Sequence, residues 1–271
     1  MSAPWVPVIA TLFIWWFATG VVLMLDGLPR RSFRWSLLLS GVLAIFGLWL
    51  VARTAADTST LGAYLAFGSA LLLWGWLELS FLTGLITGPR KVAAEPGCSE
   101  GRRFMQAAAA ILYHELALLA GLGLMIVLTW EQANAVAAWT FAVLWSMRLS
   151  AKLNLFLGVR NLSEEFLPQH LAYLRGYFRR RRMNWLLPVS LVAAAIPVAG
   201  LAQAAMAAQP GSFDATQLTL IATLLVLGML EHVFMVLPFS ASALWRWGMG
   251  KGHVGKTFDT PIGQAGGTTR S

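Results

Sequence analysis

The chain is 271 residues long, with 58% hydrophobic and only 12% charged residues and a net charge of +8. That charged fraction is about half of the roughly 25% typical of soluble domains, which is too little to cover the surface of a soluble protein of this length. The single cysteine, Cys98, excludes an internal disulfide and a cysteine metal cluster.

Seven apolar stretches are long enough to cross a membrane, since about 20 mostly apolar residues span a hydrocarbon core about 30 Å thick. In chain order they are 6–25, 35–52, 61–87, 104–130, 133–149, 185–206 and 218–239. The predicted fold is all-α: one polytopic membrane domain, 1–248, of about seven transmembrane helices. A tail rich in Gly, Thr and charge, 249–271, is predicted to be flexible and cytoplasmic.

Positive charges alternate between the connections. Nineteen of the twenty Lys and Arg residues follow the first, third, fifth and seventh stretches, and only Arg53 falls on the opposite side. Because Lys and Arg in short loops stay in the cytoplasm, this pattern predicts an outer N-terminus and a cytoplasmic C-terminus. On this interpretation Arg148 and Lys152 belong to a cytoplasmic loop.

The largest connection, 150–184, is predicted to be cytoplasmic and to contain an interfacial amphipathic helix. Pro168 suits the first turn of a helix, and the apolar residues around it recur at helical spacing. The arginines that follow are expected to face lipid headgroups. The apolar stripe is Leu167, Leu171, Leu174 and Phe178, and the lipid-facing basic residues are Arg179, Arg180, Arg181 and Arg182.

Five ionisable residues fall inside the apolar stretches, where each costs about 2.5 kcal/mol or more and is a candidate for function. Glu78, His114 and Glu231 lie nine, ten and eight residues from the predicted cytoplasmic ends of their helices. At about 1.5 Å per residue they share a depth of roughly 12 to 15 Å. A stripe of small residues on the same side of its helix predicts that His114 faces the bundle. The candidate ligand-binding residues are Glu78, His114, Glu115, Glu231 and His232.

Three interpretations of this polar layer remain open. Glu–His pairs can lock the helices together, the layer can bind a metal or the magnesium of a chlorophyll-type ring, or it can relay protons. In the cytoplasmic loop, Glu164, Glu165 and His170 are further metal candidates if the loop closes over the layer. Their spacing does not match the Glu-x-x-His of di-iron bundles. No nucleotide-binding motif is present, and topology explains the arginine run without nucleic acid.

Residues 152–177 read KLNLFLGVRNLSEEFLPQHLAYLRGY, with YHE at 113–115 and LEH at 230–232. In these motifs the chain resembles the PuhE family of photosynthetic complex assembly proteins of purple and related phototrophic bacteria, over nearly all its length except the tail. The resemblance implies a protein of the bacterial cytoplasmic membrane, in which the outer N-terminus predicted from the charge pattern would be periplasmic. It implies a role in making the reaction centre and its light-harvesting partner, and an influence on bacteriochlorophyll supply. It supplies no catalytic residues.

Two functional hypotheses follow. The first is an assembly factor without turnover that holds bacteriochlorophyll, a precursor or a nascent subunit, with His114 or His232 as an axial ligand. Its partners would be membrane lipid and either photosynthetic complex subunits or pigment-synthesis enzymes. The alternative is a membrane-embedded, metal-dependent enzyme of pigment metabolism, with iron as the candidate metal. Its ligands would be drawn from Glu78, Glu164, Glu165, His114, His170 and His232.

Overall fold

A computed structural model describes residues 4–237 and 241–248, and in this part the chain is helical and forms no strand. The α-helices are α1 (Val6–Asp26), α2 (Phe33–Thr54), α3 (Thr60–Leu82), α4 (Glu100–Leu128), α5 (Val136–Leu157), α6 (Leu186–Ala207) and α7 (Phe213–Phe234). The 3-10 helices are η1 (Arg30–Ser32), η2 (Glu164–Phe166), η3 (Gln169–Tyr177) and η4 (Ala241–Trp245). The predicted all-α class is confirmed here, and the predicted tail, 249–271, lies outside the described residues.

Six of the predicted spans meet the length and apolarity of a membrane-crossing helix. They are α1, α2 with η1, α3, α4, α6 and α7. The seventh prediction, 133–149, corresponds to α5, which carries Arg148 and Lys152 and is not among the six. Nevertheless α5 lies within the bundle, where it packs against α3, α4, α6 and α7. The predicted count of seven spans is therefore confirmed for six.

Serine caps begin several of these helices. The Ser59 hydroxyl accepts a hydrogen bond from the backbone N–H of Gly62 at 3.0 Å, and Ser212 accepts from Ala215 at 3.1 Å. Such a cap satisfies one of the four backbone N–H groups that the first turn of a helix leaves without a partner. The polar residues just before α3 and α7 therefore fix where these two helices start.

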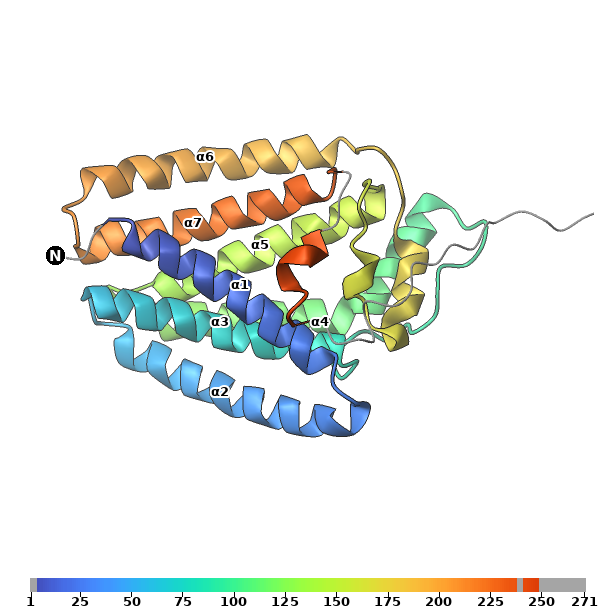
Figure 1. Cartoon of the computed structure of the whole chain (residues 1–271), viewed down its shortest axis with the longest axis horizontal. Helices are drawn as coiled ribbons and strands as arrows, with labels where there is room; N and C mark the ends of the chain where they lie inside the picture. Colours follow the sequence, from blue (N-terminus) through green and yellow to red (C-terminus); the bar gives the residue numbers. More distant parts are fainter. Residues whose placement is uncertain (1–3, 238–240, 249–271) are drawn as a thin grey trace, which may run out of the picture.

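The helices run side by side along the long axis of the molecule, with α2 and α6 at opposite edges (Figure 1). The central helix is α3, in which 61% of the apolar stretch is buried, compared with 11% in α6. Close packing in the core depends on small residues, as in other membrane bundles. A Cβ added at Gly121 of α4 would lie 2.9 Å from Cζ of Phe141 on α5, so a larger residue there would push the two helices apart.

Three predicted boundaries differ from the structure, at the ends of α3, α5 and α7. The third stretch was predicted to stay helical to residue 87, but α3 ends at Leu82. The following segment folds back on α4, where the Thr87 carbonyl accepts a hydrogen bond from the backbone N–H of His114 at 2.9 Å. The loop that the sequence predicts from residue 150 begins only after Leu157, the last residue of α5.

The predicted amphipathic helix appears as η3, a 3-10 helix of nine residues. Its buried residues, Leu171, Leu174 and Tyr177, pack against Phe81 and Ala110 of the bundle. The apolar side of this segment therefore rests on protein, and its interfacial placement against lipid is not confirmed. Figure 1 shows it in yellow at the end of the bundle that also carries the start of α4.

After α7 the chain returns along α1 as η4 (Figure 1). The Trp245 indole N–H donates to the carbonyl of Trp16 at 3.0 Å. Gly20 leaves room for this return, because a Cβ there would lie 2.0 Å from the Trp247 ring. The seventh stretch was predicted to run to residue 239, but α7 ends at Phe234, and residues 238–240 lie outside the described part.

Candidate functional site

Helix α5 carries two cations into the predicted polar layer. The Arg148 guanidinium donates to Oε2 of Glu78 on α3 at 3.0 Å, and the Lys152 ammonium donates to Oε1 of Glu115 on α4 at 2.5 Å. The sequence interpretation had placed both cations in a cytoplasmic loop, which is wrong, because both belong to a helix packed inside the bundle. Each ion pair joins two helices, so the charges offset the cost of burying one another.

Glu78 and His114 meet between α3 and α4. Oε1 of Glu78 lies 3.9 Å from Nε2 of His114, and the ring centroid of His114 lies 4.5 Å from that of Phe81. His114 is fully buried, which confirms that it faces the bundle. Neither ring nitrogen of His114 has a hydrogen-bond partner among the described residues, and neither has Oε1 of Glu78. Unsatisfied groups of this kind are costly, so the pair is the least satisfied part of the layer.

His232 is also buried, but both of its ring nitrogens are engaged. Nδ1 lies 2.8 Å from the carbonyl oxygen of Gly228, and Nε2 lies 2.9 Å from the hydroxyl of Ser150 on α5. A carbonyl can only accept, so Nδ1 carries the hydrogen of its contact with Gly228. The Ser150 hydroxyl also lies 2.9 Å from that of Ser190, which extends the contact to α6.

Glu231 points to a different neighbour. Its Oε1 accepts a hydrogen bond from the indole N–H of Trp15 on α1 at 2.8 Å. Glu231 also interacts electrostatically with Arg148, which already pairs with Glu78. The layer thus holds three carboxylates and two cationic side chains, and it draws on every α-helix except α2.

The structure connects the five predicted residues mainly through α5. Only Glu78 and His114 approach each other as an acid–imidazole pair. Sequence reasoning missed the polar residues that link the others: Trp15, Arg148, Ser150, Lys152 and Ser190. A usable signal was present, because Arg148 and Lys152 lie four residues apart, as do Ser150 and Asn154. Such spacing places each pair on one side of a helix that continues past residue 149.

The loop candidates lie apart from this layer. Nε2 of His170 lies 2.7 Å from the carbonyl oxygen of Leu82, where it satisfies the end of α3. Burial lowers the pKa of His170 below its ordinary value. Glu164 pairs with Arg180 at 3.5 Å, and Glu165 lies beside it in η2. Among the described residues, no group of three or more His, Cys, Asp or Glu side chains is arranged to hold a metal ion.

The arginine run divides into two parts. Arg179 forms an ion pair with Glu100, at the start of α4. Arg103, one turn further along α4, donates to the carbonyls of Tyr177 and Phe156 and lies over the Phe156 ring, 3.7 Å from its centroid. These contacts tie α4, α5 and η3 together. The remaining arginines, Arg180, Arg181 and Arg182, line an open cavity instead.

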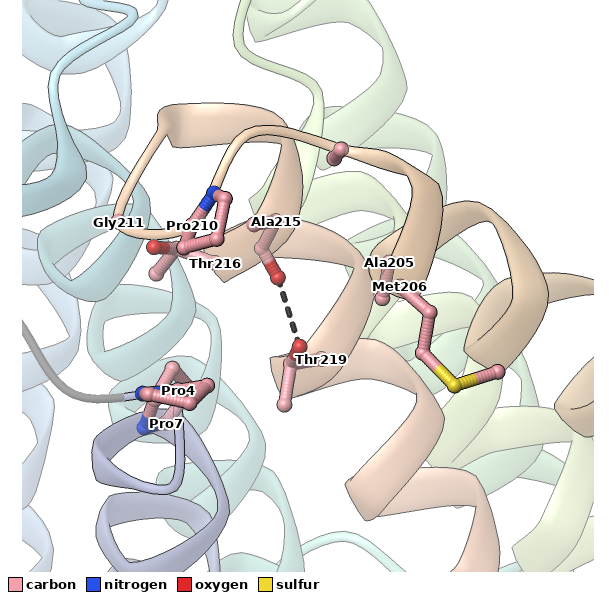
Figure 2. A pocket seen from close by; sticks show the side chains of 10 residues that line it. Pro4, Pro7, Ala205, Met206, Pro210, Gly211, Ala215, Thr216 and Thr219 are labelled. Atoms are coloured by element: carbon pink, nitrogen blue, oxygen red, sulfur yellow. Dashed lines mark hydrogen bonds between the residues drawn. The ribbon is translucent and has the colours of Figure 1, made fainter.

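A smaller cavity of about 290 Å³ lies at the other end of the bundle, between the start of α1 and the α6–α7 turn. Figure 2 shows Pro4 and Pro7 on one side and Pro210 and Gly211 on the other. The Thr219 hydroxyl on its wall donates to the carbonyl of Ala215 at 2.7 Å and is therefore already satisfied. No charged residue lines this cavity, so it offers little to orient a polar ligand.

The fold and the polar layer define an all-helical protein with six helices suited to cross a membrane, whose helices are joined by part-buried ion pairs. The chain belongs to a family described as "Protein of unknown function (DUF3623)", whose model matches residues 1–255. It is 40% identical over 252 residues to an "Uncharacterized 30.4 kDa protein in puhA 5'region" of Rhodobacter capsulatus, and the match covers 91% of each chain. No solved structure matches it.

Proposed function

We propose that this chain is an integral membrane factor for assembly of the bacterial photosynthetic reaction centre and its light-harvesting complex. The observation that carries the proposal is the relative from Rhodobacter capsulatus, which is similar over nearly its whole length and is named for its position in the puhA 5' region, within a photosynthesis gene region. The six apolar helices support a site of action in the membrane where these complexes are built.

The ion pairs between helices favour a scaffold over a catalyst. Glu78 and Glu115 are each held by a cation of α5. A carboxylate held in this way has its charge and position fixed, whereas a general acid or base must exchange a proton with its substrate. The layer therefore suits a bundle of fixed shape that presents its outer faces to other membrane helices.

Within this role, His114 is the better candidate for an axial ligand to bacteriochlorophyll or a precursor. A neutral imidazole binds a metal through a nitrogen lone pair. Both nitrogens of His232 already make hydrogen bonds, whereas those of His114 make none within the described residues. Because His114 is enclosed beside Phe81, a pigment would reach it only if the Phe81 ring moved aside.

The assembly role is tested by deleting the gene in its phototrophic host and recording the whole-cell near-infrared spectrum. We expect the reaction-centre and light-harvesting bands to fall and to return when the wild-type gene is supplied. Glu78→Gln, which breaks the ion pair between α3 and α5, should restore them less well than the exposed variant Glu131→Gln. Unchanged bands in the deletion strain would contradict the proposal.

Pigment handling needs a separate test on the purified protein. We expect full-length protein from the host, isolated in mild detergent, to carry a bacteriochlorin absorption band. His114→Ala should lose the band, whereas His232→Ala should retain it. Retention of pigment by His114→Ala would exclude His114 as the ligand, and a colourless wild-type protein would reject pigment handling while leaving the assembly role to the deletion experiment.

A further inference from the structure

A second cavity opens at the end of the bundle where α5 ends and α6 begins. It has a volume of about 810 Å³ and lies between the loop 160–165 and the arginines at 180–182, with Leu237 beside it. Four of its lining residues are arginines, namely Arg160, Arg180, Arg181 and Arg182, and two are glutamates, Glu164 and Glu165. The wall therefore carries two more positive than negative side chains.

The backbone that carries these arginines is pinned to the end of α5. The Val159 N–H donates to the carbonyl of Arg179 at 3.1 Å, and the Val159 carbonyl accepts from the N–H of Arg181 at 3.0 Å. Asn184 adds a third attachment through its side-chain amide, which donates to the carbonyls of Asn154 and Gly158. The arginines are thus presented by a segment with fixed ends, which lowers the entropy lost when a ligand binds.

Gly158 determines how the stem of Arg181 lies. Its φ of +115° is in the region that favours glycine, and a Cβ at this position would lie 2.8 Å from Cγ of Arg181. The Arg181 stem therefore rests directly on the backbone at the end of α5.

Three of the four arginines in this cavity form no ion pair with the residues that the structure describes. Arg180 pairs with Glu164 at 3.5 Å, but Arg160, Arg181 and Arg182 have no carboxylate partner among the described residues. The backbone N–H groups of Asn161, Ser163 and Arg181 already donate within the protein. The guanidinium groups of Arg160, Arg181 and Arg182 line the cavity and are charged donors that a ligand can use.

We propose that this cavity binds a phosphate-bearing group through Arg160, Arg181 and Arg182. The planar guanidinium presents paired donors that match the oxygens of a phosphate. Immediately after the arginines, Met183 and Trp185 are 53% and 85% exposed at the start of α6, as expected at the boundary between headgroups and hydrocarbon. A phospholipid headgroup and a free phosphate share this chemistry, and the proposal does not depend on the role in photosynthetic assembly.

The test measures binding of short-chain phosphatidylglycerol to the full-length protein in mild detergent by native mass spectrometry, with short-chain phosphatidylcholine as the neutral comparison. The triple variant Arg160→Gln, Arg181→Gln, Arg182→Gln removes the unpaired charges. A matched control, Arg30→Gln, Arg31→Gln, Arg34→Gln, removes three exposed arginines from the α1–α2 connection at the same end of the bundle. Tryptophan fluorescence melts without lipid check that each variant is folded.

We expect phosphatidylglycerol to bind more tightly than phosphatidylcholine, and the cavity variant to weaken it by about five-fold for each arginine removed. The control variant should change it by less than about two-fold. Displacement by millimolar inorganic phosphate would identify a site for phosphate alone, whereas resistance to phosphate would identify a lipid site. Equal loss in both triple variants, equal binding of the two lipids, or full binding by the cavity variant would overturn the proposal.

Discussion

The Arg148 guanidinium donates to Oε2 of Glu78 at 3.0 Å and so joins α5 to α3 inside the bundle. Glu78 is only 7% exposed, and the remaining carboxylate oxygen faces His114 rather than a second cation. The pair therefore fixes the position of α5 against α3, the most buried of the six apolar helices.

Removing either partner should destabilise the protein strongly. We expect Glu78→Gln to lower the free energy of unfolding by roughly 1.5 to 3 kcal/mol, because it weakens a charge-assisted hydrogen bond and leaves the part-buried Arg148 guanidinium without its carboxylate. Unfolding by sodium dodecyl sulfate in mixed micelles, followed by tryptophan fluorescence, measures this. The exposed Glu131→Gln is the matched control and should change stability by less than about 0.5 kcal/mol.

The double variant Glu78→Gln, Arg148→Gln separates the pair from the individual side chains. Since both charges disappear together, its loss of stability should be smaller than the sum of the two single losses. If the single losses add within about 0.5 kcal/mol, the two residues are not coupled, and the ion pair contributes nothing as a unit.

The packing of the C-terminal segment, η4 and Trp247, against α1 depends on Gly20. A Cβ here would lie 2.0 Å from the Trp247 ring, so Gly20→Ala should displace the ring and cost about 1 to 3 kcal/mol. Limited proteolysis should then cleave the C-terminal segment faster than in the wild type. In Gly123→Ala the new Cβ meets no atom, so that variant should gain stability from its better helix propensity. Equal proteolysis of both variants would show that Trp247 does not rest on Gly20.

Acid should destabilise the contact between η3 and the end of α3. Burial lowers the pKa of His170 below its ordinary value of 6.5, and the positive charge of Arg30 lowers it further. The hydrogen bond to the Leu82 carbonyl raises this pKa but does not cancel the lowering. As the pH falls below about 6.5, the unfolded chain takes up the proton before the folded chain does, so the stability present at neutral pH is progressively lost. Melting temperatures between pH 7.5 and 5.5 should therefore fall more steeply in the wild type than in His170→Gln. Parallel slopes would show that His170 does not contribute.

Cys98 reports on orientation, because it is the only cysteine and is partly exposed in the connection before α4. The charge pattern predicts this connection to be cytoplasmic. A membrane-impermeant maleimide should therefore label inside-out vesicles and leave right-side-out spheroplasts unlabelled. Cys98→Ala combined with Gln132→Cys, between α4 and α5, should give the opposite result. Labelling of Cys98 from outside would reverse the predicted topology.

The all-α class, six of the apolar helices and the inward direction of His114 could be predicted from the amino-acid sequence. These features follow from composition and from periodicity within one helix, which neighbouring residues along the chain define. The acids and imidazoles of the layer were also visible, because any ionisable residue inside a long apolar stretch stands out.

The roles of Arg148 and Lys152 could not be predicted without the packing of α5 against α3 and α4. In the sequence, two cations so close together are typical of the start of a loop. A hydropathy average covers only neighbouring residues, so it cannot include Glu78, the partner of Arg148, which lies 70 residues away. The acceptors on α3 and α4 offset the cost of these charges and let α5 continue to Leu157. The packing of Trp247 against Gly20 could not be predicted either. A glycine in the sequence indicates a place where space is needed, but not which side chain fills it.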